Sequence, residues 1–219
     1  MIATLKESVR VSRSHTVILR LIDRGLAGLL LLALTPALAV AAAAIWFLSG
    51  RRSPLVVHLR VGVLGRDFWM IKFRTMWPRS VPRRPEERGW IEHVVSKQLP
   101  DVKPRNDPRV TSSFAAAFRK YSLDELPQLW HVLLGEMSLV GPRPLVAAEL
   151  DLHYGAQAAE VLEVLPGVTG LWQIMGRNDL SYWRRRRLDL FLVRHYSWRL
   201  YWKILLRTIP EVLKGSGAR

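Results

Sequence analysis

The chain has 219 residues, of which 49% are hydrophobic and 9% aromatic. This composition excludes a disordered polypeptide, and the length suits one domain with a substantial core and an appendage. The formal net charge of +15 favours anionic partners such as phosphorylated substrates, acidic lipid headgroups or nucleic acid. The sequence has no cysteine, and its six histidines form no close pair. Disulfides and thiolate metal sites are therefore excluded, and a zinc enzyme is not expected.

A long hydrophobic segment follows a basic N-terminus. Residues 26–48 carry no charge, and a straight helix of this length would cross a bilayer core of ~30 Å. Pro36 removes a backbone hydrogen bond and predicts a bend, where the Thr35 hydroxyl can satisfy a freed carbonyl. Lysines and arginines flank the segment on both sides, and such flanks stay on the cytoplasmic side. We predict a re-entrant helix bent at Thr35 and Pro36, with a kinked transmembrane helix as the alternative.

A β-hairpin is predicted next. Residues 55–57 and 68–71 are apolar and partly β-branched or aromatic, and glycines punctuate the turn between them. Alternation places Lys72 and Arg74 on one face of the second strand. There they form either an anion-binding edge or a charged edge that prevents further strand pairing.

The middle of the chain predicts a loop and then helices. Residues 78–108 are rich in proline and arginine, which indicates a long loop with a short helix near residues 90–97. Gly135 is a natural residue to end a helix. Helices are expected over residues 114–121, 122–134 and 144–165.

Two adjacent carboxylates, Asp124 and Glu125, stand out in so basic a chain. Ser122 and Glu125 match a capping box, in which each side chain satisfies a backbone N–H of the other residue. In that interpretation Asp124 only complements the positive end of the helix. The alternative is a chemical role for the acid pair.

Two arginines lie in loops suited to anions. The sequence GPRP at residues 141–144 places Pro142 and Pro144 around Arg143. The prolines fix the backbone and hold the guanidinium rigidly, as a phosphate clamp requires. Arg177 lies in a second loop, beside a glycine. A purely structural loop is the alternative in each case.

The C-terminal region from Ser181 mixes arginines with aromatic residues and carries an apolar stripe. Cationic side chains with Trp and Tyr suit the headgroup layer of a membrane. A helix packed on its own domain and a nucleic-acid groove are the alternatives. The hydrophobic segment near the N-terminus favours interfacial amphipathic helices.

Five motifs occur in one order behind the proline-broken segment: KFRTM (72–76), DPRVT (107–111), SLDELPQ (122–128), GPRP (141–144) and PGVTG (166–170). Together they resemble the bacterial sugar transferases, which are monotopic phosphoglycosyl transferases. The similarity covers residues 20–209, and the chain has room only for the catalytic core of the larger members. His58 and Leu59 depart from the family's pattern, as does Phe114.

This resemblance implies a fold and a location. We expect an α+β, mostly helical protein with a re-entrant membrane helix, a small β-hairpin and interfacial amphipathic helices. Residues 1–50 form the basic N-terminus and membrane helix, and residues 51–219 form a cytoplasmic, membrane-associated catalytic domain. The expected location is the cytoplasmic face of the bacterial inner membrane, in a monotopic arrangement.

The resemblance also implies a reaction. The family transfers a sugar-1-phosphate from a UDP-sugar to polyprenyl (undecaprenyl) phosphate with Mg²⁺ and releases UMP, in the first membrane step of surface glycan or glycoconjugate synthesis. Asp124 matches the nucleophile of an aspartyl-phosphosugar intermediate, and Glu125 matches its partner acid. Beside Arg119, at a helix start, Asp124 is expected to stay ionised. Both acids can share Mg²⁺ with the substrate. The expected substrate-binding residues are Lys72, Arg74, Arg119, Pro142, Arg143, Pro144 and Arg177.

The alternative is a non-catalytic, basic, membrane-anchored module that binds anionic lipid or nucleic acid. It accounts for the charge and the C-terminal region, but it gives no reason for the acid pair or the rigid Arg143 loop. We expect a UDP-sugar, polyprenyl phosphate and membrane lipid as partners, and no nucleic acid. The sequence leaves the sugar, the glycan pathway and homo-oligomerisation open.

Overall fold

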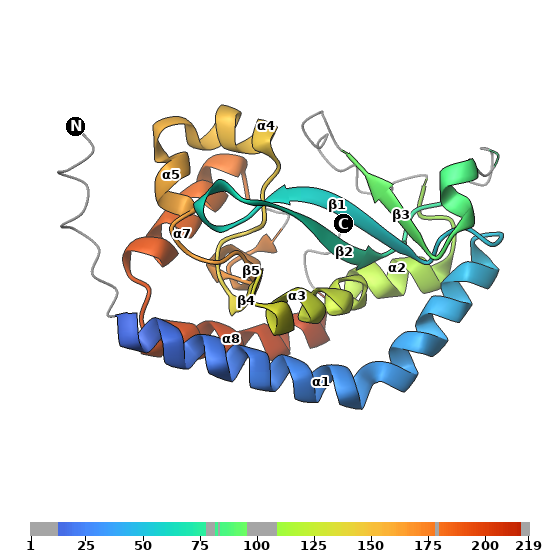
Figure 1. The fold of residues 1–219 in the computed structure, drawn as a ribbon, viewed down its shortest axis with the longest axis horizontal. Helices are drawn as coiled ribbons and strands as arrows, with labels where there is room; N and C mark the ends of the chain where they lie inside the picture. The colour runs from blue at the N-terminus through green and yellow to red at the C-terminus, as the bar shows by residue number, and fades with distance from the viewer. Residues whose placement is uncertain (1–12, 78–81, 83, 96–108, 178–179, 216–219) are drawn as a thin grey trace.

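A computed structural model describes residues 13–77, 82, 84–95, 109–177 and 180–215. These residues form a mostly helical structure with two small sheets, which confirms the expected fold class in outline. Helix α1 (Arg13–Leu48) runs along one side of the molecule, with α8 (Trp198–Lys214) beside its first half (Figure 1). In the view of Figure 1 the sheets and the shorter helices lie above α1 and α8, and α3 packs directly against α1.

Helix α1 contains the hydrophobic segment. The stretch Val17–Leu48 is long and apolar enough to cross a membrane, and little of it is buried in the protein. Pro36 lies inside the helix, which bends about midway along its length (Figure 1). The Thr35 hydroxyl donates to the Leu31 carbonyl at 2.6 Å. The hydroxyl therefore bonds back within its own helix, as expected of a polar residue in an apolar medium.

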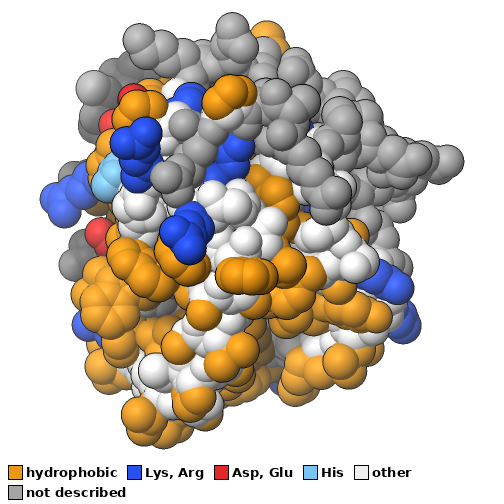
Figure 2. Space-filling view, turned by 90° about the vertical axis from the view of Figure 1, so that its right-hand side faces the viewer, with side chains coloured by type: hydrophobic (Ala, Val, Ile, Leu, Met, Phe, Trp, Pro, Cys, Tyr) orange, Lys and Arg blue, Asp and Glu red, His pale blue; other side chains and the backbone are white. Residues whose placement is uncertain are grey.

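Both halves of α1 pack against the rest of the chain. Leu19 and Ala27 from the first half are buried in the main core. Ala41 and Ile45 from the second half are buried in another cluster, which includes Trp77. Between these contacts α1 is largely exposed, and apolar side chains gather over the lower part of the molecule (Figure 2).

The first sheet contains the predicted hairpin and one further strand. Strands β1 (Leu55–Val61) and β2 (Asp67–Phe73) pair antiparallel, as predicted. Strand β3 (Ile91–Val94) pairs parallel with β1 and gives the order β2-β1-β3. The short helix predicted near residues 90–97 is therefore wrong where the structure describes this segment. Glu92 points inward and pairs with the buried Arg74, which holds the segment extended against β1.

The acid pair lies between two helices of the middle region. Helix α2 (Ser113–Lys120) begins after Ser112, whose side chain caps it, and agrees with the prediction. The predicted helix over 122–134 starts as a 3-10 helix, η4 (Leu123–Gln128), and continues as α3 (Leu129–Leu134). Gly135 ends α3 at φ 83°, a left-handed conformation that glycine adopts without strain.

The single helix predicted over residues 144–165 is wrong, because the region is broken into short turns. Gly155 adopts φ 49° and ψ −123°, a conformation outside the helical range, and so interrupts the run. The pieces are α4 (Ala147–Glu149), a π-helical turn (Leu150–Tyr154), a 3-10 turn (Gly155–Gln157) and α5 (Ala158–Val161).

A second sheet, which the sequence did not indicate, supports the Arg143 loop. Strands β4 (Ser138–Val140) and β5 (Gly167–Thr169) pair in parallel. A Cβ atom on Gly167 would lie 2.1 Å from the Gly141 backbone nitrogen, so only glycine allows this approach. The loop that carries Arg143 is thereby held against the turn before β5.

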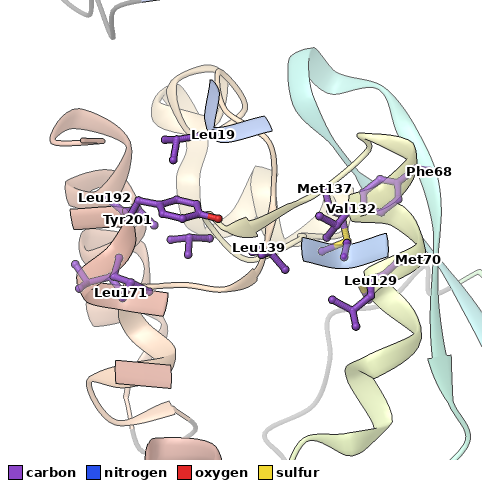
Figure 3. Close-up of a cluster of buried hydrophobic side chains, with 13 residues drawn as sticks. Leu19, Phe68, Met70, Leu129, Val132, Met137, Leu139, Leu171, Leu192 and Tyr201 are labelled. Atoms are coloured by element: carbon purple, nitrogen blue, oxygen red, sulfur yellow. The ribbon is translucent and has the colours of Figure 1, made fainter. Parts of the chain in front are cut away.

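The C-terminal region forms two capped helices after α6 (Leu171–Ile174). Ser181 caps α7 (Tyr182–Arg194), and Ser197 caps α8. Side chains from α8 and α7 meet those of α1, α3, β2 and β4 in the main core (Figure 3). The outer face of α8 carries exposed apolar residues: Trp198, Leu206, Ile209 and Leu213. An amphipathic α8 beside the apolar α1 agrees with the expected membrane association.

Candidate active site

The acid pair sits in the first turn of η4, directly after a strained residue. Ser122 has φ 54°, and within the described residues its side chain caps no backbone N–H. Arg177 instead donates from Nη2 to the Ser122 hydroxyl at 2.8 Å. The capping-box interpretation is therefore wrong, because the left-handed Ser122 turns its hydroxyl toward Arg177. The pairing brings Arg177 to the turn that bears Asp124 and Glu125.

Lys72 extends from β2 to Glu125. The distance from Lys72 Nζ to Glu125 Oε1 is 2.7 Å, and both side chains are mostly buried. Lys72 and Glu125 line a small pocket together with Arg143 and Pro144. The structure thus brings together four predicted site residues that lie far apart in the sequence: Lys72, Glu125, Arg143 and Pro144.

The Asp124 carboxyl is less acidic than an ordinary aspartate. Burial, and after it the neighbouring Glu125 charge, raises its pKa to about 6. Lys72 and Arg119 oppose this shift without cancelling it. Asp124 is ionised above about pH 6, as expected, and burial gives the carboxylate a greater basicity than the cations alone would allow.

Arg74 does not reach this site, which corrects the predicted pairing of Lys72 and Arg74 on one face. Strand β2 ends at Phe73, and Arg74 turns inward. Its guanidinium donates to the Ser53 carbonyl at 2.7 Å and forms a buried ion pair with Glu92. Arg74 thus anchors β3 to the hairpin, because a buried guanidinium requires a carboxylate partner.

His131 joins the strand of Lys72 to the helix that follows the acid pair. The Ile71 backbone N–H donates to His131 Nε2 at 3.0 Å, and His131 Nδ1 lies 2.6 Å from Glu136 Oε2. Since Nε2 accepts, Nδ1 carries the proton and donates to Glu136. The contact fixes β2 against α3, next to Lys72. Sequence inspection gave no signal for this histidine.

Arg143 lies in a cluster of arginines and aromatic rings. Its guanidinium carbon is 5.5 Å from the centre of the Trp172 ring, and that of Arg185 is 5.1 Å from the same centre. Arg60 is close as well: burial and the Arg143 charge lower the Arg60 pKa to about 10. Cations held this near to one another favour an anion between them. Arg60, Trp172 and Arg185 were not predicted, because no local pattern links them to Arg143.

A buried carboxyl supports the Arg143 loop from behind. Tyr154 donates its hydroxyl to Asp189 Oδ2 at 2.8 Å, and the Arg143 backbone and side chain both favour the charged form of this carboxyl. Burial raises the Asp189 pKa to about 7, and these hydrogen bonds and the nearby arginines limit the rise. The one local signal for this residue is that it is an aspartate within an arginine-rich helix.

The raised pKa of Asp189 predicts a pH-dependent stability. Its carboxyl binds a proton more tightly when folded, so its stabilising contribution is complete below about pH 4 and is lost as the pH rises through about 7. Asp189→Asn still accepts from Tyr154 but does not titrate. We expect the free energy of unfolding of wild type to fall between pH 5 and 8 by on the order of 3 kcal/mol more than that of the variant. Thermal melting of both proteins in detergent measures this, and parallel pH dependence would contradict it.

Comparison with known proteins places the chain in a family. The sequence model of the bacterial sugar transferases matches residues 14–215. The chain belongs to the bacterial sugar transferase family. It is 44% identical over 166 residues to the UDP-galactose-lipid carrier transferase of Erwinia amylovora, an alignment that covers 76% of this chain and 34% of the relative.

Two further relatives are identical to this chain to a comparable extent. Over 161 residues the chain is 43% identical to the exopolysaccharide production protein ExoY of Rhizobium meliloti, covering 74% of this chain and 70% of ExoY. Over 161 residues it is 42% identical to the undecaprenyl-phosphate galactose phosphotransferase of Salmonella typhimurium, covering 74% of this chain and 33% of the relative. The chain thus spans about a third of the length of the Erwinia and Salmonella proteins.

The two departures from the family's pattern have structural roles. His58 lies on β1, where burial and then the charges of Arg60, Lys72 and Arg74 lower its pKa to about 4, so it is neutral at physiological pH. Phe114 stacks on Phe118 with ring centres 4.4 Å apart, beside the second half of α1. Neither residue lies among those that line the small pocket at Lys72 and Glu125.

The acid pair offers the metal ligands that the family implies. Among the described residues, no three His, Cys, Asp or Glu side chains gather to form a metal site of their own. Asp124 and Glu125 supply two adjacent carboxylates near cations that suit phosphate oxygens. Mg²⁺ is commonly bound by one or two carboxylates together with substrate phosphates, so the donor set fits Mg²⁺ carried by a nucleotide substrate.

Proposed function

We propose that this protein transfers a sugar-1-phosphate from a UDP-sugar to polyprenyl phosphate and releases UMP. The observation that carries the proposal is Asp124, a carboxyl with a pKa raised to about 6 in a turn surrounded by Lys72, Arg119 and Arg177. The names of the relatives support the same chemistry, since they include transferases that act on undecaprenyl phosphate.

The reaction proceeds in two balanced steps. An Asp124 oxygen attacks the sugar-linked phosphorus of the UDP-sugar, the phosphoanhydride bond breaks, and UMP leaves with the bridging oxygen. A phosphate oxygen of polyprenyl phosphate then attacks the aspartyl-phosphosugar and forms a new phosphoanhydride, which frees Asp124. No general base is needed for either attacking oxygen, because carboxylate and phosphate are both ionised at neutral pH.

The surrounding residues bind and orient the phosphates. Arg143 and Arg177 hold the diphosphate, and Lys72 orients Glu125 and offsets its charge. Asp124 and Glu125 would hold Mg²⁺, which would supply positive charge to offset that of the phosphates. Pro142 and Pro144 keep the Arg143 loop rigid, so that little conformational entropy is lost on binding.

A non-catalytic membrane module is the weaker alternative. The exposed apolar faces of α1 and α8 and the net charge of +15 agree with it. It gives no account of the half-buried Asp124 beside Glu125, whose raised pKa costs folding free energy and is typical of functional sites.

Release of UMP tests the proposed reaction directly. Purified protein in detergent is incubated with polyprenyl phosphate, Mg²⁺ and a panel of UDP-sugars, and UMP is measured. We expect catalytic turnover to UMP from at least one UDP-sugar when the lipid phosphate is present, and no more than about one UMP per protein without it. A complete panel without UMP, from protein that is folded by thermal melting, would favour the non-catalytic alternative.

We also propose that α1 is re-entrant at the cytoplasmic face. Support comes from its packing: Leu19 and Ala27 from one half, and Ala41 and Ile45 from the other, are all buried against the same folded unit. A helix that crossed a bilayer would place its two ends on opposite sides, where one unit of this size cannot cover both.

Cysteine labelling distinguishes the two arrangements, and the chain has no native cysteine to interfere. Single cysteines placed near residue 10 and at Arg51 are exposed to an impermeant thiol reagent added outside intact cells. We expect both to be protected in intact cells and both to react after permeabilisation, which serves as the control. Reaction of only one of them in intact cells would identify a spanning helix.

A further inference from the structure

One carboxyl on α1 lies inside the protein, between Arg20 and Arg24 and just before the uncharged residues 26–48. Asp23 is only 2% exposed and belongs to the stretch Val17–Leu48. An ionisable side chain in a membrane-associated helix is costly unless it is paired, and such residues commonly have a function. Asp23 is not among the residues to which the resemblance gives a role.

Asp23 joins three elements through hydrogen bonds. Ser138, the first residue of β4, donates its hydroxyl to Asp23 Oδ2 at 2.6 Å. Tyr201, which is fully buried on α8, donates its hydroxyl to Asp23 Oδ1. The Tyr201 hydroxyl points from α8 into the interior, toward the elements that carry Leu19 and Leu139 (Figure 3). We call Asp23, Ser138 and Tyr201 the Asp23 latch.

The latch lies close in sequence to the Arg143 loop, because Ser138 is separated from that loop only by the rest of β4. Strand β4 runs from Ser138 to Val140 and continues directly into the loop that bears Arg143. The loop cannot shift by itself, because the Gly141 backbone N–H donates to the Thr169 carbonyl of β5 at 2.9 Å.

A second bond from the same sheet leads to α8. The Thr169 and Thr208 hydroxyl oxygens are 2.8 Å apart, which links β5 to α8. Both strands beneath the Arg143 loop are thereby tied to helices with exposed apolar faces. Hydrogen bonds thus join α1 and α8 to the two strands from which the Arg143 loop extends.

We propose that Asp23 is a positioning residue: the Asp23 latch sets the height of the Arg143 loop and the acid pair above the membrane, and so governs reaction with the lipid acceptor. This inference rests on the proposed function. A UDP-sugar arrives from water and needs no particular height, whereas the phosphate of a polyprenyl lipid is confined to the headgroup layer. Loosening the latch therefore affects the second step of the reaction more than the first.

The test measures the two steps separately on the full chain. Asp23→Leu removes both acceptor oxygens, and Ser138→Ala and Tyr201→Phe each remove one hydroxyl. The first step is followed by transfer of label from a radiolabelled UDP-sugar to protein without lipid, and the second by the KM for polyprenyl phosphate. For each variant we expect labelling within about twofold of wild type and a KM for the lipid raised about tenfold.

A double variant tests whether the residues act as one unit. The only hydrogen bond that the structure gives the Tyr201 hydroxyl among the described residues is to Asp23, so adding Tyr201→Phe to Asp23→Leu is expected to raise the lipid KM no further than Asp23→Leu alone. Ser49→Ala is the matched control. It deletes another buried hydroxyl, one that bonds near the C-terminal end of α1 to Trp46 and Arg52, and it is expected to change neither step.

The outcomes separate the latch from the function it rests on. Equal losses in both steps, or an unchanged lipid KM in folded variants, would overturn the positioning role. Wild-type protein that takes up no label would overturn the proposed function, and the latch with it. If Asp23→Leu fails to fold, Ser138→Ala and Tyr201→Phe decide the question, since each leaves Asp23 one hydroxyl partner.

Discussion

Replacing Asp124 with asparagine is expected to abolish transfer while the protein remains folded. An amide cannot attack phosphorus to give the acyl phosphate, so UMP release is expected to fall by about three orders of magnitude or more. The measurement is UMP release at saturating UDP-sugar, polyprenyl phosphate and Mg²⁺. Turnover near the wild-type rate would remove Asp124 from the chemistry.

The same substitution is expected to leave stability unchanged or to raise it. Burial and the Glu125 charge raise the Asp124 pKa to about 6, so the carboxyl destabilises the fold above that pH, and a neutral amide removes the penalty. A residue that only complemented the helix end would instead cost about 0.3–1 kcal/mol when neutralised. Thermal melting at pH 8 without Mg²⁺ distinguishes these signs. Glu125→Gln is the matched control for the melting experiment. It also removes one negative charge from the acid pair, but it keeps Asp124.

Arg143→Lys is expected to retain charge and lose most activity. The flanking prolines fix the loop, and the guanidinium lies over the Trp172 ring at 5.5 Å. A lysine lacks the planar fork that binds two phosphate oxygens at once, so we expect kcat/KM to fall about 10–100-fold. Steady-state UMP release with UDP-sugar as the varied substrate gives this value.

A second arginine provides the control for that substitution. Arg184 lies exposed on α7, outside the residues that line the pocket at Lys72, Glu125 and Arg143. Arg184→Lys is expected to leave kcat/KM unchanged within about twofold, as is usual for surface substitutions. Equal activity of wild type and Arg143→Lys would show that bidentate geometry is not required.

Local sequence patterns predicted the elements that depend on neighbours in the chain. The hairpin of β1 and β2 follows from strand propensity, and the end of α3 follows from the left-handed conformation of Gly135. Helix α2 agrees with the helix predicted over residues 114–121, although its cap at Ser112 was not predicted. Pro36 and the apolar run indicated α1 for the same reason. Each of these signals lies within a few residues of the structure it specifies.

Contacts between distant segments were not predictable in this way. Sheet β4–β5 requires the close approach of Gly141 and Gly167. The local sequence of neither short strand predicts this pairing. The predicted position of Arg74 was wrong because alternation along β2 carries no information about Glu92. Glu92 lies on β3, which pairs with β1 from a later part of the chain. Ser122 and Glu125 match the capping-box pattern, but the Ser122 hydroxyl instead accepts a hydrogen bond from Arg177 in a distant loop.

The candidate site shows the same division. Its motifs marked Asp124, Glu125, Lys72 and Arg143, and the family supplied their expected roles. The supporting residues Asp23, Asp189 and His131 act through tertiary contacts, so their importance became visible only when their partners were in place. In each case a single polar residue in an unremarkable local context holds an element of the site.

Trapping the covalent intermediate tests the central claim most directly. Wild-type protein and Asp124→Asn are incubated with a UDP-sugar radiolabelled in the sugar, with Mg²⁺ and without a lipid acceptor, and denatured protein is counted. We expect wild type to retain label, to release it when polyprenyl phosphate is added before denaturation, and to yield a labelled peptide that contains Asp124. The Asp124→Asn variant is expected to retain none. Undiminished labelling of that variant would place the nucleophile elsewhere and contradict the account.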